Sequence, residues 1–124
     1  MRVINETEER TTTTPTGVMT ALAGPSQGSD QVSTWRVRLA AEAESPVHLI
    51  DHDQVWMPIS GTFSFTVGDE TSTASAGQAV LLRANEVRQF RPVGGPAEAL
   101  VCMAAAGRAG VPGTDGRQSL PWAL

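Results

Sequence analysis

Apolar and polar residues alternate in short segments along most of this chain. In residues 32–40, single polar residues separate Trp35, Val37 and Leu39, so the apolar side chains fall on one face of an extended strand. Residues 62–67 alternate in the same way. A period of two predicts β-strands with one buried face, and no segment shows a sustained helical period.

Similar short segments, separated by turn residues, follow one another through the rest of the chain. An apolar run at 17–23 precedes a turn cluster at 24–30 that is rich in Gly and Ser. Residues 97–106 have helical propensity, but we expect a strand there because a β-barrel built from the preceding strands would need a last strand to close it. About eight or nine short strands at this spacing are typical of a β-sandwich or barrel. We expect the further strands at 47–50, 54–59, 71–74, 78–82, 87–91 and 99–104.

The length of 124 residues predicts one domain that buries its own core. Residues 1–16 are polar and rich in Thr, and we expect a flexible arm or an edge strand there. Residues 17–106 form the predicted barrel. Residues 107–124 are rich in Gly and Pro and predict an irregular tail.

Composition limits the partners that the chain is expected to have. The net charge of −4, without any basic run, gives no general attraction to nucleic acid or to an anionic membrane. No apolar run approaches the ~18 residues of a membrane span, and the first residues lack the apolar core of a secretory signal. Cys102 is the single cysteine, which excludes an intramolecular disulfide and a Cys-based zinc site. We expect a cytoplasmic protein.

Two segments in the middle of the chain have a characteristic spacing. Residues 42–61 read E-x5-H-x-I-x3-Q-x6-G, and residues 77–92 read G-x5-R-x-N-x2-R-x3-P. This spacing resembles the two-part signature of the cupin superfamily, G-x5-H-x-H-x3-4-E-x6-G followed by G-x5-P-x-G-x2-H-x3-N. The glycines at Gly61 and Gly77 match, and the resemblance covers about half of the chain.

The resemblance implies an all-β fold, the double-stranded β-helix or jelly-roll barrel of a small, single-domain, RmlC-like bacterial cupin. Small cupins usually pair through an N-terminal strand or through the outer sheet. The resemblance therefore implies a homodimer, with the Thr-rich residues 9–16 as a candidate exchanged edge strand.

The cupin pattern also implies where a metal would bind, and here the chain departs from the family. His48 keeps its ligand position, whereas the other three positions hold Ile50, Gln54 and Arg88. Arginine has no available lone pair and stays positively charged. We therefore predict no metal cofactor. The alternative is a rearranged site for Fe or Zn built from His48 and His52, with Asp51 or Asp53 as a further ligand.

Strand parity and the cupin pattern together predict the lining of a pocket inside the barrel. His48 is the candidate proton shuttle, Arg88 the candidate stabiliser of an oxyanion, and Gln54 the group that orients a carbonyl. Each also has a structural interpretation: His48 as a rim histidine, and Arg88 as a buried cation held by Gln54 or by backbone carbonyls. The other predicted substrate contacts are Ile50, Trp56 and Phe90, with Arg36 and Arg38 at the barrel mouth.

Arg36 and Arg38 have an alternative interpretation as an exposed pair on an edge strand, and Trp56 as plain core. The candidate residues suit isomerisation, dehydration or cyclisation of a hydrophobic small molecule. Small cupin-like proteins of natural-product pathways include polyketide cyclases. The resemblance thus implies a metal-independent cyclase or isomerase of bacterial specialised, polyketide-type metabolism. The alternatives are a metal-dependent oxygenase or cyclase with a rearranged site, and a non-catalytic ligand-binding or sensor cupin.

Overall fold

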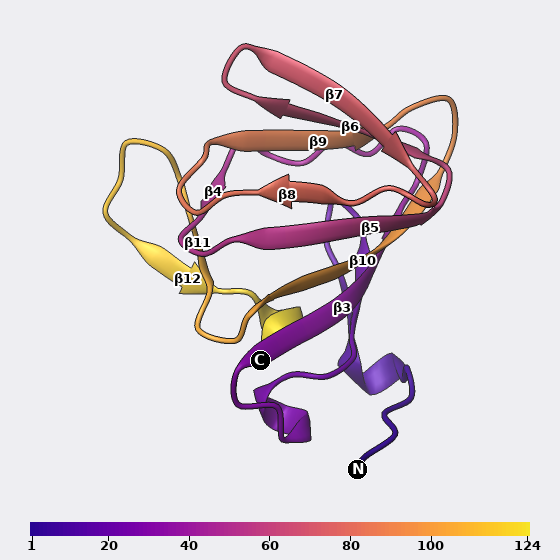
Figure 1. Ribbon diagram of the computed structural model, residues 1–124, viewed down its shortest axis with the longest axis vertical. Coiled ribbons are helices and arrows are strands. Elements are labelled where there is room, and N and C mark those ends of the chain that lie inside the picture. The colour runs from indigo at the N-terminus through magenta and orange to yellow at the C-terminus, as the bar shows by residue number, and fades with distance from the viewer.

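The computed structural model describes residues 1–124, which form twelve strands and three short 3-10 helices (Figure 1). No helix is long and apolar enough to cross a membrane. The 3-10 helices are η1 (Glu8–Arg10), η2 (Pro25–Gln27) and η3 (Pro121–Ala123). The strands are β1 (Thr11–Thr13), β2 (Val18–Ala21), β3 (Val32–Leu39), β4 (Leu49–Ile50), β5 (Gln54–Ser60), β6 (Thr62–Val67), β7 (Glu70–Ser75), β8 (Val80–Leu82), β9 (Arg88–Pro92), β10 (Ala97–Ala104), β11 (Arg108–Gly110) and β12 (Arg117–Ser119).

These strands make three antiparallel sheets. The largest has the order β1-β2-β3-β10-β5-β8, and the two smaller ones have the orders β7-β6-β9 and β12-β11-β4. Figure 1 shows the β7-β6-β9 layer stacked beside β8, β5, β10 and β3. Neighbours that are distant in sequence, such as β3 and β10, are paired throughout, as in a jelly-roll barrel.

β3 and β10 form the middle of the large sheet, and every second side chain of both strands is buried. Trp35, Val37 and Leu39 of β3 are at most 2% exposed, and every second residue of β10 is buried as well. The two strands pair along their full lengths, from Val32 opposite Ala104 onward. Because β5 pairs with the other edge of β10, the strand interpretation of residues 97–106 is confirmed.

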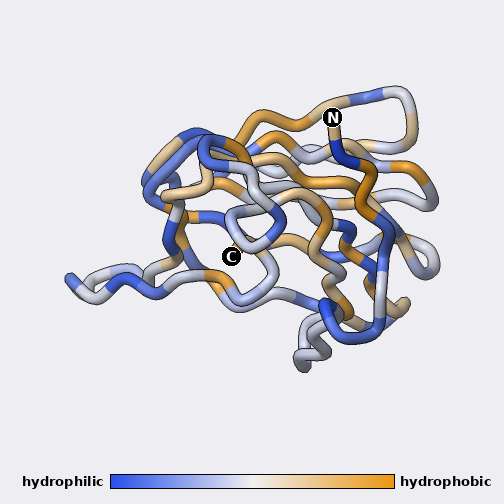
Figure 2. The backbone as a smooth tube through the Cα atoms, turned by 90° about the horizontal axis from the view of Figure 1, so that it is seen from below, coloured by the Kyte–Doolittle hydropathy of each residue, from blue (hydrophilic) through white to orange (hydrophobic).

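The core lies between the large sheet and the β7-β6-β9 sheet. Trp56 of β5 packs against Phe90 of β9 with ring centroids 4.6 Å apart, and against Phe65 and Phe63 of β6 at 5.4 Å and 5.7 Å. Such tilted and edge-on contacts are favourable for aromatic rings. Figure 2 shows apolar positions recurring along the strands, while long polar stretches run through the connecting segments. The interior of the barrel is therefore filled by its own side chains.

The C-terminal segment is more ordered than the predicted irregular tail. It forms β11 and β12, and β11 also pairs with β4. η3 then packs under the barrel, where Ala123 is buried and its carbonyl accepts a hydrogen bond of 2.6 Å from the Ser33 hydroxyl. Strands of three residues with glycine between them are too short to show a period, so their hydropathy gives no signal.

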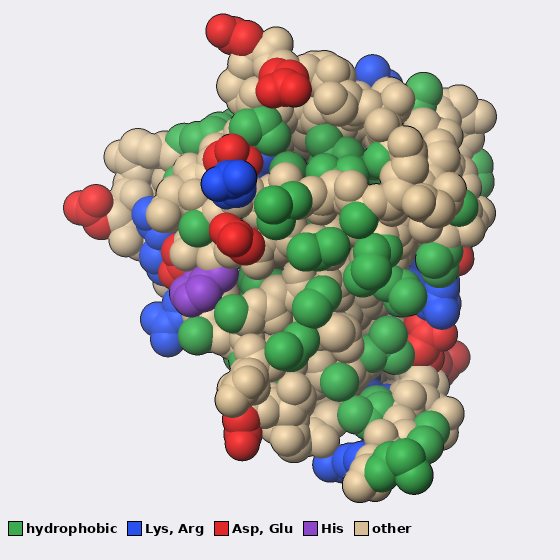
Figure 3. Space-filling view, viewed as in Figure 1, with side chains coloured by type: hydrophobic (Ala, Val, Ile, Leu, Met, Phe, Trp, Pro, Cys, Tyr) green, Lys and Arg blue, Asp and Glu red, His purple; other side chains and the backbone are tan.

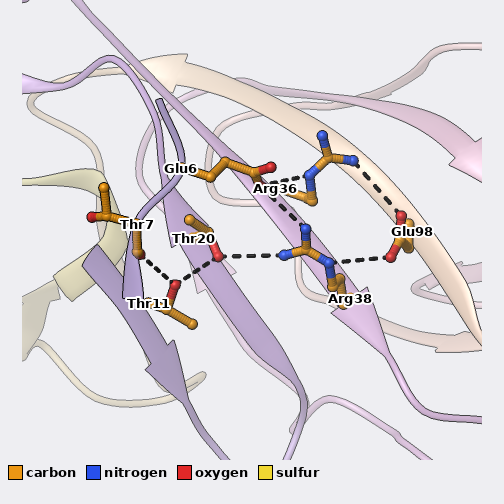
Figure 4. A network of polar contacts seen from close by, with 7 residues as sticks. All are labelled: Glu6, Thr7, Thr11, Thr20, Arg36, Arg38 and Glu98. Atoms are coloured by element: carbon orange, nitrogen blue, oxygen red, sulfur yellow. Dashed lines mark hydrogen bonds and ion pairs between the residues drawn. The ribbon is translucent and has the colours of Figure 1, made fainter. Parts of the chain in front are cut away.

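The N-terminal segment lies along the outer face of the large sheet. β1 pairs with β2 of its own chain and forms the edge strand. Figure 4 shows Glu6 reaching the guanidinium groups of Arg36 and Arg38 at 2.7 Å and 3.3 Å, and Glu98 pairing with the same two arginines. The hydrogen bond from Arg36 lowers the pKa of Glu6. The two arginines therefore bind acids on the outer face of the sheet, as in the alternative interpretation, but they are partly buried and β3 is an interior strand rather than an edge strand.

The glycines that match the cupin pattern include one that the fold requires. Gly61 has φ +70° in the turn between β5 and β6, and an added Cβ would collide with the carbonyl oxygen of Pro96. Gly68, which is not a position of the pattern, has φ +59° in the turn between β6 and β7, with open space around it. The first glycine has both a conformational and a steric reason, and the second has only the conformational one.

We expect Gly61→Ala to reduce the free energy of unfolding much more than Gly68→Ala. A left-handed alanine costs about 1–2 kcal/mol, and only Gly61→Ala adds a clash with fixed backbone. Urea denaturation of both variants measures the difference. Equal losses in the two variants would show that the Pro96 contact does not constrain the turn.

Candidate functional site

A pocket of about 550 Å³ opens between the β11–β12 hairpin, η3, the turn joining β1 to β2 and the loop that precedes β4. Its ionisable side chains are His48 and Arg117, and no Asp or Glu lines it. A mostly apolar concavity with a few convergent polar groups is the usual form of a small-molecule site. The apolar side chains of its wall include Met19, Phe90, Leu120 and Trp122.

His48 is held in the pocket wall by the backbone of β9. Its N–H donates to the Arg88 carbonyl at 3.0 Å, and its own carbonyl accepts from the Arg88 N–H at 2.8 Å. The imidazole lies edge-on to Phe90, with ring centroids 5.8 Å apart. Nδ1 lies 2.8 Å from the Pro46 carbonyl oxygen. A carbonyl only accepts hydrogen bonds, so Nδ1 carries the proton and Nε2 is the basic nitrogen of the neutral ring.

The surroundings of His48 favour this neutral ring. Burial lowers the pKa of His48 below its usual 6.5, and the positive charge of Arg88 lowers it further. The Pro46 carbonyl acts in the opposite direction and raises the pKa, but burial prevails. No protein group hydrogen-bonds Nε2. His48 therefore presents a free basic nitrogen at neutral pH in the wall of the pocket.

Arg88 is 1% exposed and is bound entirely by neutral acceptors. Nε donates to the Glu86 carbonyl at 2.7 Å, Nη2 donates to the Arg83 carbonyl at 2.8 Å, and Nη1 donates to Gln54 Oε1 at 3.2 Å. Burial lowers the pKa of Arg88, and the charge of Glu86 opposes that shift. The guanidinium thus ties together the turn before β9 and the start of β5, and it does not line the pocket.

Gln54, Trp56 and Ile50 point inward, as strand parity predicts, but they lie in the core rather than in the pocket wall. Trp56 Nε1 donates to Gln54 Oε1 at 3.3 Å, so this oxygen accepts from both Trp56 and Arg88. Gln54 Nε2 lies 3.6 Å from the Met103 sulfur. Of the predicted lining, the pocket contains His48 and Phe90. Arg36 and Arg38 lie on the outer face of β3 and do not line it.

The side chains at the cupin ligand positions do not fit a metal ion. Arg88 places a cation at the third histidine position, and neither it nor Ile50 has a lone pair for a metal. His52 Nδ1 bonds Asp51 Oδ1 at 2.8 Å, and neither residue lines the pocket. No group of three or more His, Cys, Asp or Glu side chains is placed to hold a metal ion.

Asp51 is used structurally. Burial alone would raise the pKa of its carboxyl, but hydrogen bonds from the His52 ring and from the Arg108 N–H lower it. The Arg108 N–H bond measures 2.7 Å and fixes the start of β11 beside β4. Asp51 therefore positions the C-terminal hairpin.

The sequence interpretation missed the pocket residues that come from the C-terminal segment. Arg117, Leu120 and Trp122 line the pocket, yet they follow a stretch rich in Gly and Pro that has no strand period. The one available signal was the apolar end of the tail, where Leu120 and Trp122 follow the polar and glycine-containing residues 113–119. Such a pair needs a hydrophobic surface to cover, and here it covers the open end of the barrel.

We expect Arg88→Ala to lower the free energy of unfolding by about 3 kcal/mol, because it leaves the Gln54 oxygen and two carbonyls short of a charged donor. Arg83→Ala is the matched control, because its side chain is exposed and it keeps the backbone carbonyl that Arg88 binds. We expect the control to change stability by no more than about 0.5 kcal/mol. Urea denaturation measures both, and a stable Arg88→Ala protein would contradict this structural role.

No protein-family model and no curated protein matches the sequence, whereas solved structures match the fold. An RmlC-like cupin with a double-stranded β-helix fold, from Methanocaldococcus jannaschii, is 17% identical with a TM-score of 0.67, and the match covers 84% of this chain and 90% of that one. The polyketide cyclase RemF from Streptomyces resistomycificus is 16% identical with a TM-score of 0.67, covering 82% of this chain and 73% of that one.

KdgF from Halomonas sp. is 14% identical with a TM-score of 0.67, and the match covers 81% of this chain and 84% of that one. At such identities the likeness establishes the fold alone. The same fold is indicated by the strand order, by the turn glycines Gly61 and Gly77 and by these structural matches. The chain is a small protein with the cupin fold, a double-stranded β-helix.

Proposed function

We propose that this protein binds an apolar, ring-containing small molecule in the pocket beside His48 and catalyses a metal-independent isomerisation or cyclisation there. The observation that carries the proposal is the state of His48: a neutral ring with a free Nε2 in the wall of an apolar pocket. A histidine whose pKa is lowered is unprotonated at neutral pH when substrate binds, so it can act as the base.

The proposed chemistry needs only a proton transfer. His48 Nε2 removes a proton from a carbon next to a carbonyl of the substrate, which leaves an enolate. The enolate either receives the same proton at another position, which completes an isomerisation, or attacks a second carbonyl of the molecule, which closes a ring before His48 returns the proton to the new alkoxide. No oxidant or reductant is required in either case.

Arg88 and Gln54 act on this reaction through His48, as positioning residues. The charge of Arg88 lowers the pKa of His48, and Gln54 helps to hold Arg88 in place. Trp56 supports Phe90 from the core side, and Phe90 packs on the His48 ring. The apolar wall limits the water that competes for the enolate. We place the protein in the cytoplasm, where its free Cys102 would stay reduced.

The polyketide cyclase RemF supports the choice of reaction class, because it has the same fold and matches most of this chain. We extend this reaction class to the present protein and place it in bacterial specialised, polyketide-type metabolism. The metal-dependent alternative would need His48 and His52 in one site, and His52 is instead bound to Asp51 outside the pocket.

The proposal predicts exchange of the α-protons of a bicyclic aromatic ketone. In D2O, we expect the wild-type protein to accelerate α-proton exchange of 1-tetralone, followed by NMR, and His48→Gln to exchange it at least tenfold more slowly. His52→Gln is the matched control, because His52 is a half-exposed histidine outside the pocket, and we expect it to keep the wild-type rate.

Three other results would each contradict this proposal. Equal rates in His48→Gln and wild type would remove His48 as the base. Loss of exchange in both histidine variants and on treatment with a chelator would favour the rearranged metal site. Binding of 1-tetralone without exchange would favour a ligand-binding or sensor protein.

We also propose that two copies pair through the outer face of the large sheet. Figure 3 shows hydrophobic side chains gathered over the middle of this face, on β5, β8 and β10. Met57 and Ile59 of β5 are 37% and 41% exposed, and Leu81 of β8 is 53% exposed. Leu100 of β10 lies directly opposite Met57, so the apolar residues form a continuous patch. Exposed patches of this kind mark interaction sites.

A second copy is the partner that fits this patch best. Arg36, Arg38 and Glu98 border it on β3 and β10, so the rim carries both signs of charge. A two-fold interface brings the same surface of two copies together, and a rim with both signs permits opposite charges to meet there. The edge strand β1 pairs with β2 of its own chain and has no partner on its outer edge, so pairing of two copies through β1 is the alternative to pairing through the sheet face.

We expect sedimentation to give about twice the 13.1 kDa mass of one chain, and Leu81→Glu to give a monomer because it buries a charge in the interface. Val93→Glu, at a 38% exposed position outside the strands, is the control and should stay dimeric. A monomeric wild-type protein, or a dimeric Leu81→Glu variant, would contradict pairing through this face.

A further inference from the structure

The pocket contains a second ionisable side chain, Arg117, that the proposed proton transfer does not use. Arg117 begins β12 and lies opposite Gly110 of β11. A Cβ added at Gly110 would lie 2.6 Å from Arg117 Nη1 and 3.0 Å from its Cδ. The missing side chain at position 110 is thus what lets the guanidinium lie across the hairpin and into the pocket wall.

The guanidinium of Arg117 is only partly satisfied by the protein. Nη1 donates to the carbonyls of Thr114 and Gly116 at 3.2 Å and 2.9 Å, whereas Nη2 and Nε have no protein acceptor. Arg117 forms no ion pair, and the nearby Asp115 is exposed and does not line the pocket. Arg36 and Arg38, by contrast, each bind two carboxylates on the surface.

The pocket therefore carries one uncompensated positive charge. Arg117 is half-buried, no acid lines the wall, and His48 is neutral. A cation next to an apolar surface is stabilised by an anion that supplies two acceptors to its free N–H groups. A carboxylate fits this arrangement, because its two oxygens match the fork of a guanidinium.

We propose that Arg117 anchors the anionic group of the ligand, so the pocket takes apolar ring molecules that carry a carboxylate. The inference rests on the proposed function in that the same pocket binds the substrate. It assigns binding and specificity to a residue of the C-terminal hairpin, and it leaves the proton transfer to His48.

The sheet also indicates how far the anionic group lies from the reacting atoms. Leu49, Gly110 and Arg117 form one row across β4, β11 and β12, because Gly110 pairs with both of the others. Neighbouring strands are about 4.8 Å apart, so the backbones at Leu49 and Arg117 are about 10 Å apart. His48 precedes Leu49 directly. Because the guanidinium itself lies over Gly110 of the middle strand, a carboxylate on Arg117 would place the rings of a planar molecule beside His48.

Anthracene-2-carboxylate and its uncharged analogue anthracene-2-carboxamide test this inference, because they differ in charge and hardly in shape. We expect calorimetric titration of the wild-type protein to give at least tenfold tighter binding of the carboxylate. Arg117→Gln should weaken carboxylate binding at least tenfold and change carboxamide binding less than threefold. Higher salt should reduce the preference of the wild-type protein for the carboxylate.

Two further variants separate charge from position. Arg108→Gln removes an exposed arginine of the same hairpin that does not line the pocket, and it should leave both affinities unchanged. Gly110→Ala keeps the charge but displaces the guanidinium, and it should lower the ratio of carboxylate to carboxamide affinity. Thermal unfolding of each variant confirms that the fold is intact.

The outcomes distinguish this inference from the proposed function. If wild type binds both probes equally, or if Arg117→Gln keeps the preference for the carboxylate, Arg117 is not the anchor and the pocket proposal stands. If Arg117→Gln loses both probes equally, Arg117 only supports the hairpin, and the anchor is again overturned. If wild type binds neither probe, both the anchor and the proposed aromatic ligand are overturned.

Discussion

The burial of Arg88 is the constraint on which the rest of the structure depends. A guanidinium with 1% exposure and no carboxylate partner is stable only if neutral oxygens surround it, and the Glu86 and Arg83 carbonyls and the Gln54 side chain supply them. These bonds join the turn before β9 to β5, so one side chain fixes two parts of the barrel. At this position the cupin pattern has a histidine ligand. The cation thus replaces the cross-link that a metal would provide, and it makes the site unsuitable for one.

The same charge determines the chemistry of the neighbouring histidine. Arg88 and burial together lower the pKa of His48, and the Pro46 carbonyl selects the tautomer in which Nε2 is free. Arg88 therefore occupies a position where the cupin pattern has a metal ligand, and its charge helps to keep His48 a neutral base beside the apolar pocket. Arg117 is the one cation in the pocket wall. It belongs to β12, which is separated by β11 from β4, the strand that follows His48.

Much of the fold could be predicted because the strands that form it carry a clear period. β3 alternates over its whole length, and Gly61 marks a turn that only glycine fits, whereas β10 has no such period and was expected only because the barrel needs a closing strand. Parity also predicted correctly that Gln54 and Trp56 point inward. Parity could not show that these inward side chains lie in the packed core rather than in a pocket. Phe63 and Phe65 fill the barrel, so the pocket lies at its end. The hairpin that brings Arg117 to that end has strands too short for a period, and its place depends on tertiary pairing with β4.

The most direct measurement is an NMR titration of the His48 imidazole, with 15N and 13C shifts that report its protonation and its tautomer. A pKa below 6.5, together with a neutral ring that is protonated on Nδ1, would agree with the structure. A pKa above 6.5, or a neutral ring protonated on Nε2, would contradict the central claim that His48 presents a free basic nitrogen to the pocket.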